Sequence, residues 1–363
     1  MYRSSFMSVL LVVPVVLLFV TGTALFFEPE LRLLTMKKEK PTGTKIAVLG
    51  DSDSHAYRDK VLGVRRGGIY HEQTYQWTEV WNALRPQEVD FGPWGIWGTR
   101  SKVASLRAVF GLPARVMKKN DFRYNFSKSG CRCDSLFDVY PFQANSLLSL
   151  IKVNPDLFAH SLVFIRIGIN DFGQVHHLQN WAKTGLGKQA KKTVGYCLEQ
   201  IEKTVQFLLA AIPTINVVLV DISHDYNAGS LAQDAFNQDD SEGVMAVLNY
   251  YTDGLKKMAK SNEHIAYIDT VSHRNRWGDR FKGNLKMEMS LSGEQPIRND
   301  RGDEPFNLGL NDGHASTVNN GLWLQHAIIE INRQLGLKFT EISELEILTL
   351  ADPENHFKMR PSR

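Results

Sequence analysis

The chain has 363 residues, of which 43% are hydrophobic and 22% are charged, and these fractions are typical of a globular protein rather than a disordered one. Its formal net charge is only +3, and no basic stripe with interleaved aromatic residues occurs, so nucleic acid is excluded as an expected partner. The length suits one large α/β domain with insertions, or two small domains.

The first segment of the chain, Phe6–Phe27, carries no charge and is long enough to cross a bilayer as a helix. Residues 1–27 therefore predict either a cleaved signal peptide, with small residues at Thr21–Ala24, or an uncleaved anchor that contacts the membrane. Both interpretations predict an exported protein, periplasmic or membrane-anchored, whose main domain lies outside the cytoplasm. Orientation stays open, because the cations that follow the segment favour a cytoplasmic location: Arg32, Lys37, Lys38 and Lys40.

Residues 28–44 are mostly polar towards their end and are interpreted as a linker. The next residues, Ile46–Leu49, form a short apolar run that ends at Gly50, which predicts a buried parallel strand and a tight turn into a helix. Ligands of open α/β sheets bind beyond the carboxyl ends of the strands, where Ser52 would be presented. Gly-Asp-Ser is also an ordinary turn or cap sequence.

Strand and helix patterns alternate along the rest of the chain. Further strands are expected at residues 122–126, 162–167, 216–222 and 265–269. Helices are expected at residues 71–84, 141–153, 189–211, 242–260, 317–335 and 342–350. This alternation predicts an α/β fold, a three-layer α/β/α sandwich with a central parallel sheet of about five strands.

One domain is expected at residues 45–335, with insertions at about 58–120 and 273–310. The second insertion has little periodicity and is interpreted as a long loop near the active face. Residues 336–363 would form a C-terminal tail with one helical piece.

Four tryptophans divide into two pairs by their surroundings. Trp77 and Trp81 have helical spacing and are expected in the core. Trp94 and Trp97 lie among glycines, and their rings are candidates for stacking on a flat sugar face.

The chain has three cysteines, which are expected to be buried thiols: Cys131, Cys133 and Cys197. A disulfide between Cys197 and either of the others is the alternative. No group of residues shows metal-ligand spacing, so no metal site is expected.

Four short motifs follow predicted strands or precede the last predicted helix. They are GDS ending at Ser52, SKSG ending at Gly130, GIND containing Asn170, and NDGH ending at His314. In a doubly wound sheet these four places converge on one crevice. In order and spacing, the set resembles the SGNH hydrolases, the superfamily of bacterial GDSL-type esterases and lipases, over residues 45–335.

The resemblance implies an ester hydrolase that needs no cofactor. Ser52 would be the nucleophile and His314 the general base that accepts its proton. The oxyanion hole would consist of the backbone N–H groups of Ser52 and Gly130 and the side-chain amide of Asn170.

The sequence departs from the family pattern before the histidine. The family usually has an aspartate three residues before it, where this chain has Asn311, and Asp312 lies one residue nearer. Either Asp312 reaches the imidazole of His314, or a backbone carbonyl orients the ring.

The expected substrate is a small-molecule or polysaccharide ester, with removal of acetyl groups from carbohydrate as the expected reaction. A lipase or thioesterase of the same superfamily is one alternative. Asp51 and Asp53, directly after an apolar strand, also suit a magnesium-dependent phosphatase of the haloacid dehalogenase type. A catalytically inactive carbohydrate-binding module is the third alternative, and the oligomeric state is not indicated.

Overall fold

The computed structural model describes residues 43–99, 102, 115, 117–222, 241–270, 276–278, 284–292 and 295–354. The predicted signal peptide or anchor lies outside these residues, as does nearly all of the predicted linker. No helix within the described ranges is long and apolar enough to cross a membrane.

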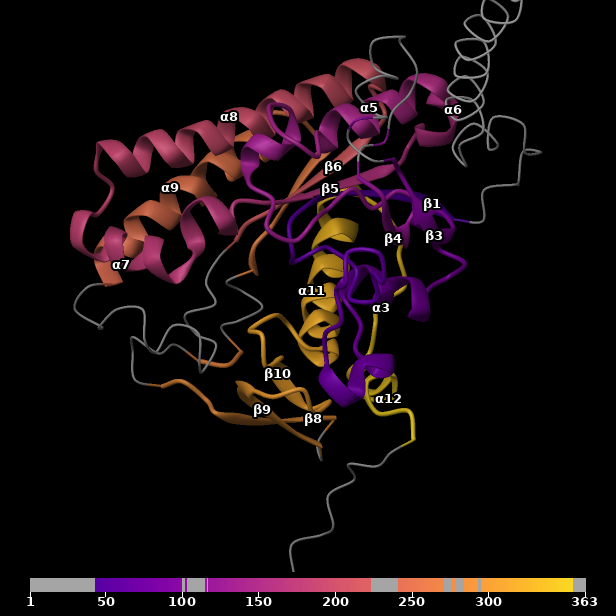
Figure 1. Cartoon of the computed structure of the whole chain (residues 1–363), viewed down its shortest axis with the longest axis vertical. Helices are drawn as coiled ribbons and strands as arrows, with labels where there is room; N and C mark the ends of the chain where they lie inside the picture. Colours follow the sequence, from indigo (N-terminus) through magenta and orange to yellow (C-terminus); the bar gives the residue numbers. More distant parts are fainter. Residues whose placement is uncertain are drawn as a thin grey trace, which may run out of the picture.

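A five-stranded parallel sheet in the order β2-β1-β5-β6-β7 lies at the centre of the molecule (Figure 1). Its strands are β1 (Thr44–Gly50), β2 (Val89–Asp90), β5 (Leu162–Arg166), β6 (Asn216–Val220) and β7 (Ile265–Ile268). Most of their residues are buried on both faces, as expected for parallel strands covered on two sides.

Helices cover both faces of this sheet, which confirms the predicted α/β/α class (Figure 1). Side chains of β1 alternate between the two cores, with Ala47 and Leu49 facing one and Ile46 and Val48 facing the other. The first core packs against α5 (Gln143–Val153), α8 (Lys188–Ala211) and α9 (Ser241–Lys260). The second packs against α3 (Trp77–Leu84), α11 (Thr317–Leu335) and α12 (Glu344–Ala351). Two shorter helices, α6 (Pro155–Phe158) and α7 (Val175–Thr184), lie on the side of the first core.

The core prediction for the first tryptophan pair is confirmed. Trp77 and Trp81 are fully buried in the second core, where their rings contact Phe91 and Phe164. Aromatic residues at this helical spacing thus fix α3 against the sheet.

The prediction of a sheet strand at residues 122–126 is wrong. β4 (Lys119–Phe122) ends there and pairs antiparallel with β3 (Trp94–Trp97), outside the central sheet. The residues after β4 meet β1 at an isolated bridge between Val48 and Asn125 and in a backbone hydrogen bond from Lys128 to Gly50. The buried amide of Asn125 bonds the carbonyl of Ser54, so this segment serves the turn after β1 instead of extending a strand.

The prediction of a long loop at residues 273–310 is also wrong. This region holds a second sheet of β8 (Glu288–Leu291), β9 (Gln295–Arg301) and β10 (Asn307–Gly309). Its strands are short and largely polar, so alternation was too weak to indicate them.

The predicted helix at residues 71–84 is split in two. A 3-10 helix, η1 (Gly68–Gln73), precedes α3, which starts at a capping box between Gln76 and Glu79. The carboxylate of Glu79 accepts the backbone N–H groups of Tyr57 and Gln76, at 3.1 and 2.9 Å. Burial of Glu79 outweighs these hydrogen bonds and raises its pKa to about 7.

We expect Glu79 to make stability depend on pH. The unfolded chain loses this proton near the ordinary pKa of 4.5, whereas the folded protein keeps it until about 7. The folded state therefore binds more protons between these values, and its stability should fall as pH rises through them, by on the order of 3 kcal/mol. Glu79→Gln, measured by urea unfolding at pH 4.5 and 7.5, should show a fall that is smaller by about this amount.

The matched control is Glu72→Gln, which changes an exposed glutamate of η1. It should leave the difference between the two pH values as in the unmodified protein. Equal pH dependence in Glu79→Gln and the unmodified protein would contradict the assignment.

Candidate active site

Ser52 lies at the carboxyl end of β1, as predicted, but on a turn rather than at the start of a helix. The turn is closed by backbone hydrogen bonds from Ser54 and His55 to the carbonyl of Asp51, at 3.2 and 3.0 Å. The side chain of Asp51 accepts the N–H of Asp53 at 3.0 Å, as in an Asx-turn. This local bonding explains why the chain does not continue into a helix here.

Neighbouring elements hold the same turn from two sides. Arg166, the last residue of β5, donates to the carbonyl of Asp53 at 3.3 Å. Gln76, at the start of α3, donates to the same carbonyl at 2.5 Å. The position of Ser52 is therefore fixed by the ends of β5 and α3.

The SKSG segment lies against the end of β1. The N–H of Lys128 donates to the carbonyl of Gly50 at 3.1 Å, and the side chain of Gln143 bonds both the N–H and the carbonyl of Gly50. Gly130 is exposed and has φ = 80°, a left-handed conformation that favours glycine. A Cβ on Gly130 would meet nothing within 4 Å, so the space beside its backbone is open.

Asn170 follows β5 on a single π-helical turn, η3 (Ile169–Gly173). Its amide nitrogen donates to the carbonyl of Cys131 at 2.8 Å, and its amide oxygen accepts from Gln174 at 2.7 Å. These two bonds set which end of the amide faces the SKSG loop. Because an amide nitrogen has two hydrogens, one remains for another acceptor. The structure thus brings Asn170 beside the residue that follows Gly130.

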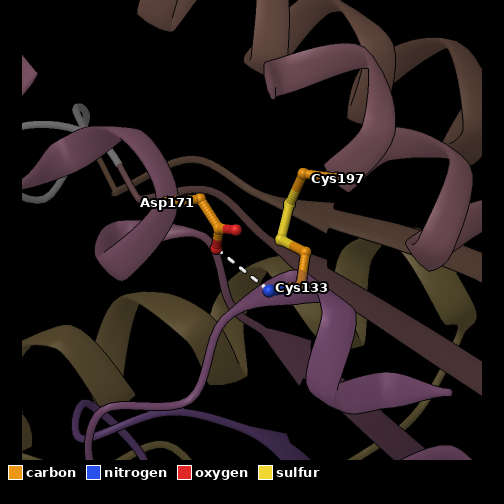
Figure 2. A group of neighbouring side chains, drawn as sticks. All are labelled: Cys133, Asp171 and Cys197. Atoms are coloured by element: carbon orange, nitrogen blue, oxygen red, sulfur yellow. Dashed lines mark hydrogen bonds between the residues drawn. A yellow bond between two sulfur atoms is a disulfide. The ribbon is translucent and has the colours of Figure 1, made fainter. Parts of the chain in front are cut away.

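Cys133 and Cys197 form a disulfide, so the prediction of buried thiols is wrong for this pair (Figure 2). It holds for Cys131, which is a buried free thiol. The bond joins η2 (Cys133–Leu136), directly after the SKSG loop, to α8. Packing of η2 on α8, which the sequence does not specify, decides which cysteine pairs.

Asp171 lies beside the disulfide and accepts the N–H of Cys133 at 3.0 Å (Figure 2). Burial raises the pKa of Asp171 to about 6 despite this bond. Cys133, Asp171 and Cys197 form the one cluster of candidate metal ligands among the described residues. Their sulfurs are consumed in the disulfide, so this donor set does not fit a metal ion.

His314 lies on the loop between β10 and α11, next to Asp312. Its Nδ1 is 3.0 Å from a carboxylate oxygen of Asp312, although the pair is not aligned well enough for a hydrogen bond. The backbone N–H of His314 donates to the other oxygen at 3.1 Å. Asn311 instead bonds Asp303 through its N–H and its amide. Asp312, and not Asn311, is thus the residue beside the imidazole.

Arg66 belongs to the same group of side chains and was not predicted, because no motif surrounds it. Its guanidinium donates to Asp312 at 2.8 Å and lies 3.1 Å from Nε2 of His314. It also packs over the ring of Tyr57, at 4.8 Å from the centroid. Because arginine can only donate, Nε2 is the acceptor, and the neutral ring carries its proton on Nδ1, towards Asp312.

The electrostatics of Asp312 follow from these neighbours. Partial burial would raise its pKa, but the contacts with His314 and Arg66 outweigh that effect and hold the pKa well below its ordinary value. Asp312 is therefore a carboxylate at neutral pH, as required of a group that orients an imidazole.

Tyr57 connects the two halves of the site. It lies five residues after Ser52, and its hydroxyl donates to the carbonyl of Ala315, next to His314, at 2.9 Å. Within the described residues, no hydrogen bond joins Ser52 to His314, since Arg66 occupies Nε2. The structure thus provides an acceptor nitrogen without showing its contact with the serine.

The two candidate stacking residues differ. Trp94 is 40% exposed, whereas Trp97 is buried, with its indole N–H bonded to the carbonyl of Pro93 at 2.9 Å. Arg123 lies over the ring of Trp97 at 5.5 Å. The stacking role expected of Trp97 therefore does not fit the structure, and only Trp94 keeps it as a proposal.

No protein-family model and no curated protein matches this sequence. Similar solved structures include phospholipase A1 from Streptomyces albidoflavus, at 13% identity over 80% of this chain and 99% of that one, with a TM-score of 0.39. An extracellular lipase from Streptomyces rimosus is 16% identical over 63% of this chain and 81% of that one, at 0.34. A gut microbial diltiazem-metabolizing enzyme is 12% identical over 83% and 48%, at 0.37.

We expect Asp312→Asn to lower kcat by orders of magnitude if Asp312 orients His314, because the carboxylate that selects the ring tautomer is lost. Asn311→Ala is the matched control, since Asn311 lies on the same loop as Asp312 but bonds Asp303, and its kcat should change less than about threefold. Ester hydrolysis of the two purified variants, both checked for unchanged melting temperature, measures this difference. Equally mild effects would show that the backbone orients the ring.

Proposed function

We propose that this protein is a serine esterase. Ser52 attacks the ester carbonyl, and Nε2 of His314 takes its proton and returns it to the leaving alcohol. Asp312 stabilises the imidazolium that forms. The observation that carries the proposal is the His314 ring, with Nδ1 beside an ionised carboxylate and Nε2 as an acceptor, in a loop tied to the turn of Ser52.

The oxyanion hole in this proposal is formed by the N–H groups of Ser52 and Gly130 and the amide of Asn170. Three features support it: the open space beside Gly130, the hydrogen bond from Lys128 of the same loop to β1, and the fixed orientation of the Asn170 amide. A preorganised donor of this kind stabilises a transition state by about 3 to 4 kcal/mol.

Arg66 has to release Nε2 before His314 can act as a base towards Ser52. It is anchored to Asp312 through Nε, so the rest of the guanidinium can leave the imidazole without losing that pair. Substrate binding would then displace one end of Arg66.

For the substrate, we propose short acyl esters of carbohydrate, acetyl groups above all. The exposed ring of Trp94 supports stacking on a sugar. A lipase or thioesterase predicts preference for long acyl chains or thioesters, and a panel of such compounds beside acetylated glycans separates these classes.

A magnesium-dependent phosphatase is not favoured by the surroundings of Asp51. Burial and the neighbouring charge of Asp53 raise the pKa of Asp51 well above its ordinary value, which opposes the anionic form that a phosphatase nucleophile needs. Arg166 also lies 3.8 Å from the carboxylate of Asp53, so the group that would act as the acid of the phosphatase is paired with a cation.

We expect Ser52→Ala to abolish ester hydrolysis without unfolding the protein, because the side-chain hydroxyl makes no hydrogen bond within the described residues. A serine-directed phosphonate should label the unmodified protein and Ser261→Ala, which changes an exposed serine after α9, but not Ser52→Ala. Mass spectrometry identifies the labelled peptide. No labelling of the unmodified protein would favour the inactive binding module.

Asn170→Ala should lower kcat by roughly 10²- to 10³-fold with little change in KM, because its amide is proposed to contact only the developing oxyanion. Gln174→Ala is the control: it removes only the donor to the Asn170 oxygen, so its kcat should fall far less. Steady-state kinetics decide, and an effect confined to KM would show that Asn170 binds the ground state.

A further inference from the structure

A second histidine lies at the end of the turn that carries Ser52. His55, three residues after Ser52, is fully buried and connects Ser129 with Asp59. Its Nδ1 is 3.0 Å from the hydroxyl of Ser129 and accepts the N–H of Ser129 at 3.3 Å. Its Nε2 is 2.9 Å from a carboxylate oxygen of Asp59, whose side chain is also fully buried.

These partners determine the state of the ring. The backbone N–H of Ser129 can only donate, so Nδ1 of His55 carries no proton, and Nε2–H donates to Asp59. Burial lowers the pKa of His55, against the opposing hydrogen bond with Asp59, which keeps the ring neutral. His55 is thus an acceptor fixed towards the SKSG loop.

Asp59 is itself held by backbone groups of two segments. Its second oxygen accepts the N–H groups of Val61, Leu62 and Asn120, at 2.8, 3.1 and 3.0 Å. Asn120 lies on β4, so the aspartate is anchored to the β3–β4 hairpin as well as to its own loop. The ring of His55 therefore has no freedom to turn away from Ser129.

Ser129 directly precedes Gly130, and the two residues share a peptide plane. The N–H of Gly130 belongs to that plane, so its direction follows from the conformation of Ser129. Glycine itself restricts the backbone little, because it has no Cβ. The backbone N–H of Cys131 donates to the carbonyl of Lys128 at 3.1 Å, which closes a four-residue turn with this peptide plane at its centre, and His55 holds the Ser129 side of that turn.

We propose that His55 and Asp59 are positioning residues that aim the N–H of Gly130 into the oxyanion hole. The inference rests on the proposed esterase function and adds residues that touch neither substrate nor reacting atoms. Ser129, His55 and Asp59 are also the residue types of a second nucleophilic triad. The positioning role is favoured because Nδ1 also accepts the backbone N–H of Ser129, which a proton-accepting base would have to share.

The test compares two substitutions at one position. His55→Leu removes the acceptor, whereas His55→Asn keeps an oxygen near the place of Nδ1 and loses only the contact with Asp59. We expect His55→Leu to lower kcat by about 10- to 100-fold with KM changed less than about threefold, since an oxyanion donor is misdirected. His55→Asn should stay within about fivefold of the unmodified kcat.

A merely structural role predicts another pattern. Both variants would then lose stability, and kcat per folded molecule would be unchanged, which would overturn the proposal. If His55→Leu does not fold, Asp59→Asn replaces it, and its kcat should fall several-fold at constant KM. An unchanged kcat in that variant would equally overturn the proposal.

Measurements of ester hydrolysis and of phosphonate labelling together separate this inference from the proposed function. If the unmodified protein is inactive and not labelled at Ser52, the esterase assignment fails. If it is active and labelled but His55→Leu keeps full kcat, only the positioning role fails. Labelling of Ser129 in the Ser52→Ala protein would replace positioning with a second nucleophile.

Discussion

The parallel pairing of β1 with β5 is the constraint on which the candidate site depends. Gly50 lies opposite Arg166, and a Cβ on Gly50 would lie 2.4 Å from the carbonyl oxygen of Arg166. Glycine therefore lets both strands reach the same edge in register. Ser52 follows two residues after one strand end and Asn170 four residues after the other. The proposed nucleophile and one proposed oxyanion donor are thus placed by backbone pairing rather than by contact with each other.

Loops at this edge are held by buried polar side chains. Gln143 bonds both backbone groups of Gly50, Asn125 bonds the carbonyl of Ser54, and His55 accepts from Ser129. Buried backbone groups outside regular structure need such partners, because leaving one unpaired costs about 1 to 3 kcal/mol. The site is therefore rigid although most of it is not helix or strand.

Elements with a strong local pattern of apolar residues could be predicted from the sequence. β5 and the helix Thr317–Leu335 have long apolar runs or strict helical periodicity, and both lie where they were predicted. Two of the four motifs, GDS and GIND, follow the ends of β1 and β5, a place that the fold class defines. Arg66 and His55 were missed, and the disulfide of Cys133 with Cys197 was only an alternative, because these roles come from contacts between distant segments, which no periodicity or spacing records. β8 to β10 were missed because their polar strands resemble a loop.

The contacts of Arg66 connect substrate binding with the availability of the proposed base. The guanidinium lies 3.1 Å from Nε2 of His314, the nitrogen that would accept the proton of Ser52 in the proposed mechanism. Arg66 also donates to Asp312 through Nε, so the carboxylate is shared between the arginine and the imidazole. This pair with Asp312 can persist while the other end of the guanidinium turns away from Nε2. A substrate that draws that end of Arg66 away from the ring would therefore free the acceptor nitrogen for Ser52 without removing the carboxylate from the imidazole.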